Sequence, residues 1–100
     1  MKHTVSTLIY LALLMLSWFA HADNASYIVC VACHGEDGAG AVSQNSPAIA
    51  GLDKQYIKRQ LENYQSGARG AAKGDIPGGI MRAIATSLTA EKIQDVSSYV

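Results

Sequence analysis

The chain has 100 residues with equal numbers of basic and acidic side chains, so its formal net charge is zero. The charges form no block of one sign, which argues against a nucleic-acid-binding face or a polybasic membrane patch. A chain of this length forms one small domain, and such domains often need a cofactor, metal or disulfide to supplement a small hydrophobic core.

The N-terminal stretch has the pattern of a secretory signal peptide. Lys2 precedes an apolar run over residues 8–20, and the Ala-His-Ala sequence at residues 20–22 offers the small residues of a cleavage site. The run is shorter than the roughly 20 residues of a membrane-spanning helix, which disfavours an uncleaved anchor. We therefore expect residues 1–22 to be a cleaved signal peptide and residues 23–100 to be an exported, periplasmic domain.

The remainder of the chain has the pattern of short helices separated by glycine-rich loops. Asp23 or Asn24 can cap a first helix that runs into the sequence CVACH at residues 30–34. After a loop rich in glycine and serine, Asp53 can cap a second helix that ends near Gly67. Apolar residues in this second helix recur at the spacing of one helical face, so one side of it should be buried.

Glycines and a proline dominate the next segment. Five glycines and Pro77 between Gly67 and Gly79 predict a loop over that range, followed by a short apolar run. Thr89 can cap a last helix, in which a buried stripe is formed by Ile93, Val96 and Val100. Because runs of β-branched residues are too short and irregular for a sheet, we predict an all-α fold.

The sequence CVACH has two cysteines two residues apart and a histidine directly after the second. A zinc site needs four ligands, but Cys30, Cys33 and His34 are the only cysteines and histidine beyond residue 22. A thioredoxin-like pair needs a βαβ pattern, and a structural disulfide would close too small a loop to add much stability. Covalent haem attachment explains all three residues, because two thiols on one helical turn can form thioethers with the two vinyl groups. His34 then supplies an axial imidazole.

A second axial ligand can be found by elimination. Low-spin haem iron takes His, Met, Cys, Tyr or an amine, and the single histidine and both cysteines are already used. Met81 is the only methionine beyond residue 22. A lone methionine is usually ordinary core filler, but beside a C-x-x-C-H motif we predict that Met81 binds the iron opposite His34.

Three segments in order resemble a small bacterial class I cytochrome c. They are CVACHGEDGAG, like the haem-binding opening; SPAIAGLDKQYIKRQLENYQSGARG, like the middle loop and helix; and GGIMRAIATSLTAEKIQDVSSYV, like the methionine loop and closing helix. The resemblance covers essentially all of residues 23–100. It implies a monohaem domain of about four short helices wrapped around one haem c, attached through Cys30 and Cys33.

The same resemblance implies further roles around the haem. The carbonyl of Pro47 should accept a hydrogen bond from the imidazole of His34, which would orient the ring and tune the iron. Tyr64 and Arg69 should lie near the haem.

A haem iron held by His34 and Met81 has no open position for a substrate and keeps both ligands on oxidation and reduction. We therefore predict a periplasmic one-electron carrier, not an enzyme, that docks transiently with redox-partner proteins. Two alternatives stay open: a haem enzyme or ligand sensor in which Met81 is displaced, and the cytochrome subunit of a larger oxidoreductase. No nucleic-acid partner and no membrane contact after signal cleavage are expected, and the sequence leaves the oligomeric state open.

Overall fold

The computed structural model describes residues 24–100, and the expected signal peptide lies outside this range. Within it the chain forms four α-helices and two short 3₁₀ helices, and an isolated bridge joins Ala41 to Ser46. The prediction of an all-α fold is therefore confirmed. None of the helices in this range is long and apolar enough to cross a membrane.

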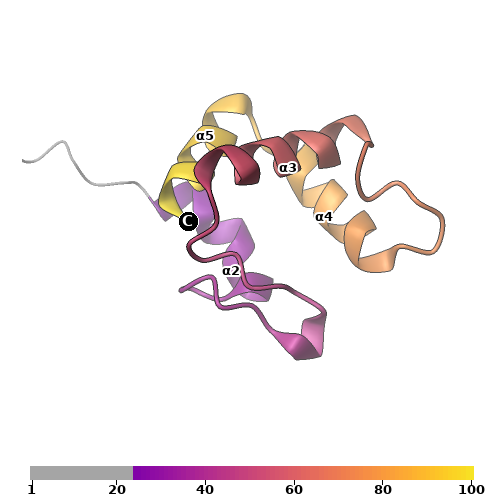
Figure 1. The fold of residues 1–100 in the computed structure, drawn as a ribbon, viewed down its shortest axis with the longest axis horizontal. Helices are drawn as coiled ribbons and strands as arrows, with labels where there is room; N and C mark the ends of the chain where they lie inside the picture. Colours follow the sequence, from indigo (N-terminus) through magenta and orange to yellow (C-terminus); the bar gives the residue numbers. More distant parts are fainter. Residues whose placement is uncertain (1–23) are drawn as a thin grey trace, which may run out of the picture.

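The helices are packed around α3, which runs across the top of the molecule in Figure 1 with α5 against it and α4 at one end. The loop between α2 and α3 lies on the opposite side of the molecule. In chain order the elements are η2 (Asn24–Tyr27), α2 (Ile28–His34), η3 (Val42–Gln44), α3 (Lys54–Ser66), α4 (Ile76–Thr86) and α5 (Ala90–Tyr99).

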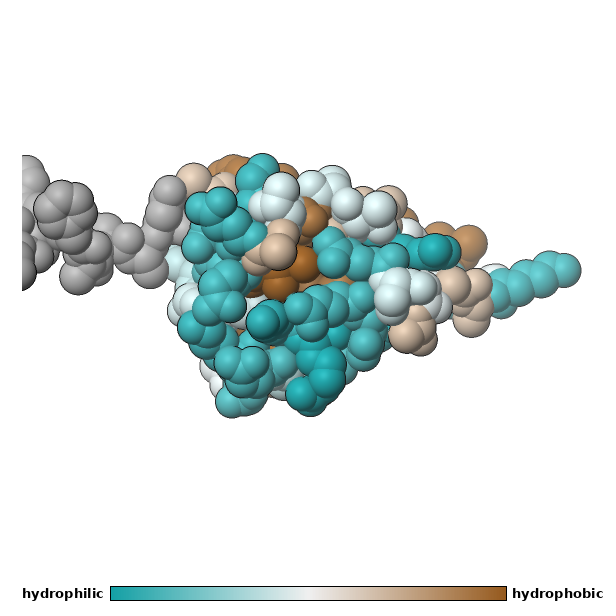
Figure 2. Space-filling model, turned by 90° about the horizontal axis from the view of Figure 1, so that it is seen from above, coloured by the Kyte–Doolittle hydropathy of each residue, from teal (hydrophilic) through white to brown (hydrophobic). Residues whose placement is uncertain are grey.

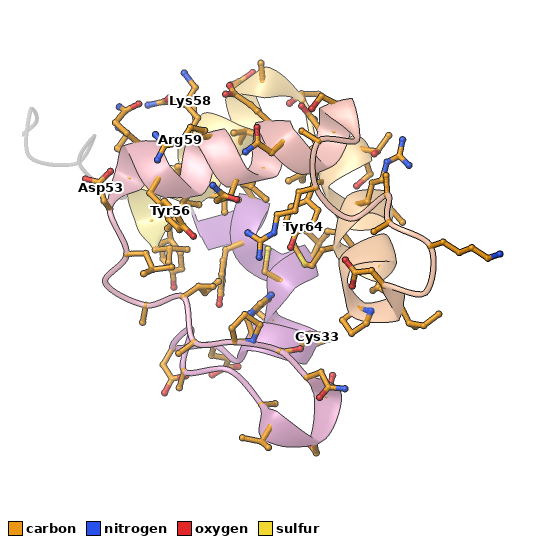
Figure 3. All side chains as sticks on the ribbon, turned by 45° about the vertical axis from the view of Figure 1, so that its right-hand side comes forward. Cys33, Asp53, Tyr56, Lys58, Arg59 and Tyr64 are labelled. Atoms are coloured by element: carbon orange, nitrogen blue, oxygen red, sulfur yellow. The ribbon has the colours of Figure 1, made fainter. Side chains whose placement is uncertain are left out.

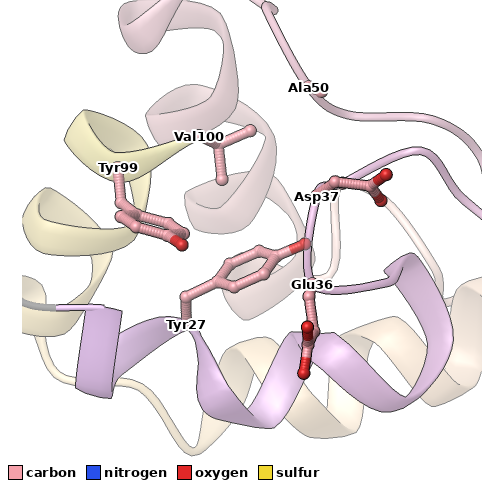
Figure 4. A pocket seen from close by; sticks show the side chains of 7 residues that line it. Tyr27, Glu36, Asp37, Ala50, Tyr99 and Val100 are labelled. Carbon is pink, nitrogen blue, oxygen red and sulfur yellow. The ribbon is translucent and has the colours of Figure 1, made fainter.

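The first helix begins as a 3₁₀ turn and becomes α-helical at Ile28, so CVACH is helical as predicted. Two contacts of Tyr27 hold this helix in place. Its hydroxyl donates a hydrogen bond to the carbonyl of Gly35 over 2.7 Å, and its ring packs on that of Tyr99, with 5.1 Å between the centroids. Figure 4 shows these two rings beside a small pocket that also includes Glu36 and Asp37. The start of the described chain is thereby tied to α5.

Both predicted ends of α3 are confirmed. The side chain of Asp53 accepts a hydrogen bond from the amide of Tyr56 over 3.0 Å, and Gly67 ends the helix in the left-handed conformation at φ 80°. The face that α3 buries carries Ile57, Leu61 and Tyr64. Its opposite face is polar: the view from above in Figure 2 is mainly hydrophilic, with a hydrophobic area recessed in the middle.

The prediction of a loop that continues to Gly79 is wrong, because α4 already begins at Ile76. Asp75 caps this helix by accepting a hydrogen bond from the amide of Gly78 over 2.9 Å. Pro77 lies in the first turn, where a helix does not need its missing N–H. A side chain at Gly78 would collide with the Asp75 carboxylate, so the glycine permits this cap. The methionine that the sequence singles out therefore lies on a helix.

Thr89 caps α5 as predicted, since its hydroxyl accepts a hydrogen bond from the amide of Lys92 over 3.2 Å. Ile93 and Val96 are buried, and Val100 packs partly buried against them, so the predicted stripe is present. The buried hydrophobic core comprises Tyr27, Cys30, Ile57, Leu61, Tyr64, Ala85, Leu88, Ile93 and Val96.

Candidate functional site

A cavity of about 870 Å³ is bounded by α2, α3, α4 and the loop before α3. This volume lies within the range of about 300–1,000 Å³ that is typical of cofactor sites. Large hydrophobic side chains on its walls are left exposed: Val29, Leu52, Tyr56 and Ile80 have exposed fractions of 40–56%. A large apolar group in the cavity would cover these side chains, so the residues present fit a macrocycle such as haem.

Helix α2 presents the two cysteines and the histidine of the motif to this cavity. Cys30, Cys33 and His34 all line it, because positions three and four apart share one face of a helix. No disulfide joins these two cysteines in the described part of the chain, so each sulfur is left for another bond. Burial raises the pKa of the Cys30 thiol, which keeps the sulfur in its protonated form at neutral pH. Figure 3 shows Cys33 on α2 facing the side of α3 that carries Tyr64.

The imidazole of His34 is buried and held by one hydrogen bond. Its Nδ1 lies 2.8 Å from the carbonyl oxygen of Pro47, which confirms the contact implied by the family resemblance. A carbonyl can only accept, so Nδ1 carries the proton and the lone pair of the neutral ring is on Nε2. The bond therefore sets both the orientation of the ring and the nitrogen that is able to bind a metal.

A glycine allows the Pro47 loop to approach this closely. The amide of Gly40 donates to the carbonyl of His34 over 2.8 Å. A Cβ at Gly40 would lie 2.6 Å from the backbone of Ser46 and Pro47, and the residue has φ 81°, which favours glycine. The loop after α2 therefore returns directly onto the helix that it leaves.

Met81 reaches the cavity from α4 and is partly buried against the core. The structure thus brings all four predicted site residues, Cys30, Cys33, His34 and Met81, to the walls of one cavity. Three come from a single helix turn, and the fourth comes from a helix more than forty positions further along the chain.

The cavity wall on α3 holds residues that sequence analysis only partly found. Tyr64 and Arg69 line the cavity, as the family resemblance implied. Tyr56 and Gln60 line it too and were missed, although with Tyr64 they follow an i, i+4, i+8 spacing that marks one stripe of a helix. That spacing was available in the sequence, but a glutamine within it gives no signal of a buried role.

The fold and site define a class of protein: a small all-α domain that holds a haem in an apolar cavity beside a C-x-x-C-H helix. The family model for cytochrome c matches residues 23–100, and this chain belongs to that family. Its cofactor is one haem c, attached covalently through Cys30 and Cys33.

Several characterised bacterial proteins are similar to this chain. The thiosulfate dehydrogenase electron acceptor of Stutzerimonas stutzeri is 33% identical over 75 residues, which are 75% of this chain and 32% of the relative. The cytochrome c4 of Azotobacter vinelandii is 35% identical over 71 residues, 71% of this chain and 32% of the relative. The cytochrome c-554(548) of Halomonas halodenitrificans is 31% identical over 70 residues, 70% of this chain and 78% of the relative.

The chain spans about a third of the length of the first two relatives. No solved structure gives a significant match.

Proposed function

We propose that this chain is a periplasmic one-electron carrier in which His34 and Met81 are the axial ligands of the haem iron. The observation that carries the proposal is that one apolar cavity is lined both by an imidazole with its Nε2 left for a metal and by the thioether of Met81. When bound, the haem supplies an iron that accepts and releases one electron.

The protein's own residues prepare this site in three ways. The Pro47 carbonyl holds the imidazole of His34 in one orientation and one tautomer, so the ring needs no rearrangement when the charge of the iron changes. Met81 offers a sulfur ligand, which favours the ferrous state relative to a second imidazole. The apolar walls exclude water and disfavour the more highly charged ferric state, which also raises the reduction potential.

The relatives support a role in transfer between proteins. One of them is named as the electron acceptor of thiosulfate dehydrogenase, and we infer that this chain likewise exchanges electrons with larger redox enzymes or other carriers. Such encounters use small interfaces, below about 1,200 Å² of total buried area, and separate quickly. The signal-peptide pattern at residues 1–22 supports export to the periplasm.

The test is the absorption spectrum of the purified holoprotein in its ferric and ferrous forms, with carbon monoxide added to the ferrous form. Ligation by Met81 predicts a weak far-red charge-transfer band in the ferric form and no reaction with carbon monoxide. The substitution Met81→Ala should abolish the band and open the iron to carbon monoxide. Ile76→Ala, which shortens an exposed side chain on the same helix, should leave both properties unchanged.

A wild-type protein that lacks the far-red band and binds carbon monoxide at once would contradict the proposal. That result would favour the enzyme or sensor alternative. Co-purification with a large catalytic subunit would favour the alternative of a cytochrome subunit.

A further inference from the structure

A glutamine side chain bonds α3 to the end of α4. Gln65, in the last turn of α3, donates hydrogen bonds from its side-chain nitrogen to the carbonyls of Ala85 and Leu88, each over 2.9 Å. Carbonyls can only accept, so both N–H groups of the amide are used. Ala85 lies in the last turn of α4 and Leu88 in the turn before α5. One side chain therefore joins α3 to both of these segments.

The two carbonyls belong to residues of the hydrophobic core. Ala85 has no exposed surface and Leu88 is buried, while Gln65 itself is half-buried. The Ala85 carbonyl also accepts a hydrogen bond from the amide of Leu88 over 3.1 Å, which closes the end of the helix. A displacement of α4 from α3 would take these carbonyl oxygens away from the amide of Gln65, and leaving partly buried acceptors without a donor costs free energy.

Met81 lies one helical turn before this bonded end. It precedes Ala85 by four positions, so the two residues share one face of α4. Towards the start of the helix, a Cβ at Gly70 would collide with the backbone of Gly78, so α4 approaches the loop after α3 closely there as well. Met81 therefore lies between two points at which α4 is fixed. Because the residues of a helix move together, both points restrict the position of the Met81 backbone.

We propose that Gln65 is a positioning residue for Met81: by bonding the end of α4 to α3, it determines how firmly the Met81 sulfur is held on the haem iron. The inference rests on the proposed ligation by Met81. Gln65 does not line the cavity, so it acts through the position of α4 and not by contact with the haem. Its two hydrogen bonds add to the free energy that is needed to move α4 and release the sulfur.

Competition with added imidazole measures this free energy. Imidazole can bind the ferric iron of the holoprotein only after Met81 has left it, so its apparent affinity reports the fraction of molecules in the open state. Loss of the far-red band during an imidazole titration gives the apparent dissociation constant. The urea midpoint and the covalent haem content are recorded on the same samples.

The main variant is Gln65→Leu, which removes both donors. Its apparent dissociation constant for imidazole should fall by about tenfold, since two hydrogen bonds no longer oppose the opening of α4. Gln65→Lys should recover much of the wild-type value. An ammonium offers three donors, and a positive charge is favourable at the C-terminal end of α4.

Two control variants separate this role from general effects. Gln94→Leu makes the same chemical change at an exposed position of α5 and should leave the imidazole affinity unchanged. Tyr27→Phe removes a hydrogen bond to the carbonyl of Gly35 at the end of α2. It should lower the urea midpoint without changing the imidazole affinity, because it does not touch α4.

Several results would overturn the proposal. Equal imidazole affinities of wild type and Gln65→Leu would show that the two hydrogen bonds do not act on Met81. An equal rise in Tyr27→Phe would indicate a general effect of stability, and a lack of recovery in Gln65→Lys would contradict a role for the donors. If Gln65→Leu does not mature, Gln65→Asn decides. Its amide is one methylene too short to reach both carbonyls, and a wild-type affinity would contradict the proposal.

The far-red band of the wild type separates this inference from the proposed function. Its absence would disprove ligation by Met81 and with it the role of Gln65. Its presence, together with equal imidazole affinities of wild type and Gln65→Leu, would disprove the role of Gln65 alone.

Discussion

The two sides of the cavity are built in different ways. On the α2 side, Cys30, Cys33 and His34 lie within five consecutive positions, and the carbonyl that orients the imidazole comes from Pro47, 13 residues further along. On the other side, Met81 depends on the packing of α4 against α3. The α2 side is thus determined by local sequence, whereas the α4 side is assembled by contacts between helices.

Specific contacts hold α4 against α3. The side-chain amide of Gln65 on α3 donates hydrogen bonds to the carbonyls of Ala85 and Leu88, each over 2.9 Å. Near the start of α4, Gly70 and Gly78 pack so closely that no side chain fits at Gly70. We therefore expect the α2 side of the cavity to be most sensitive to changes in the loop that carries Pro47. The α4 side should be most sensitive to changes in the packing of α4 against α3.

The largest effect is expected on the α2 side, from Gly40→Ala. The new methyl group would meet the backbone of Ser46 and Pro47 at 2.6 Å and push the loop away from His34. A strained left-handed residue and a lost hydrogen bond to a buried ring together should lower the free energy of unfolding by about 2–5 kcal/mol. Urea denaturation of the holoprotein measures this.

Gly51→Ala is the control for this prediction, since Gly51 has a similar φ of 76° but open space around its Cβ position. It should cost only the backbone strain, about 1–2 kcal/mol. Equal losses in the two variants would show that the Pro47 loop does not need its close approach.

A somewhat smaller and more selective effect is expected on the α4 side, from Gly70→Ala. The methyl group would collide with the carbonyl of Gly78 and come within 2.9 Å of the Tyr64 ring, which displaces the first turn of α4. We expect a loss of about 2–4 kcal/mol in unfolding free energy and a weaker far-red band, with the covalent haem content unchanged. The ferric spectrum and the urea midpoint measure the two effects.

Gly74→Ala is the control for Gly70→Ala. Gly74 lies in the same loop with a similar positive φ of 87°, but no atom lies near its Cβ position. Its far-red band should stay intact. If Gly70→Ala lowered haem attachment as much as it weakened the band, the two sides of the cavity would not be independent.

The smallest effect should come from Tyr27→Phe, which removes the hydrogen bond to the carbonyl of Gly35 at the end of α2. The expected loss at neutral pH is about 1 kcal/mol. Burial, aided by the negative charges that Tyr99 and Asp37 can carry, raises the pKa of Tyr27 above its usual value of 10.0. The stability linked to this neutral phenol is complete below about pH 10 and is lost as the pH rises through the folded-state pKa.

Urea midpoints of wild type and Tyr27→Phe at pH 7 and above pH 10 test this linkage. The wild type should lose more stability than the variant over that interval, because only the wild type has this phenol to ionise on unfolding. Parallel losses in both proteins would mean that Tyr27 keeps an ordinary pKa.

Much of this protein could be predicted from the sequence, because the signals are local. The motif CVACH lies on one helical turn, and the caps at Asp53, Gly67 and Thr89 satisfy backbone groups within three residues of themselves. The start of α4 was predicted wrongly because glycines and Pro77 are typical of loops. In the structure this segment begins a helix that is capped by Asp75 and has Pro77 in its first turn.

The sequence by itself therefore determined the attachment motif, the caps of α3 and α5, and the class of fold. The tertiary structure decided which distant residues share the cavity: the carbonyl of Pro47 beside His34, Met81 on α4, and Arg69 held by Gln60 and Tyr64. The physical reason is the distance along the sequence between the residues that interact. A cap or a C-x-x-C-H turn is satisfied within one helical turn, whereas the cavity exists only when helices far apart in sequence pack together and leave apolar side chains facing one another.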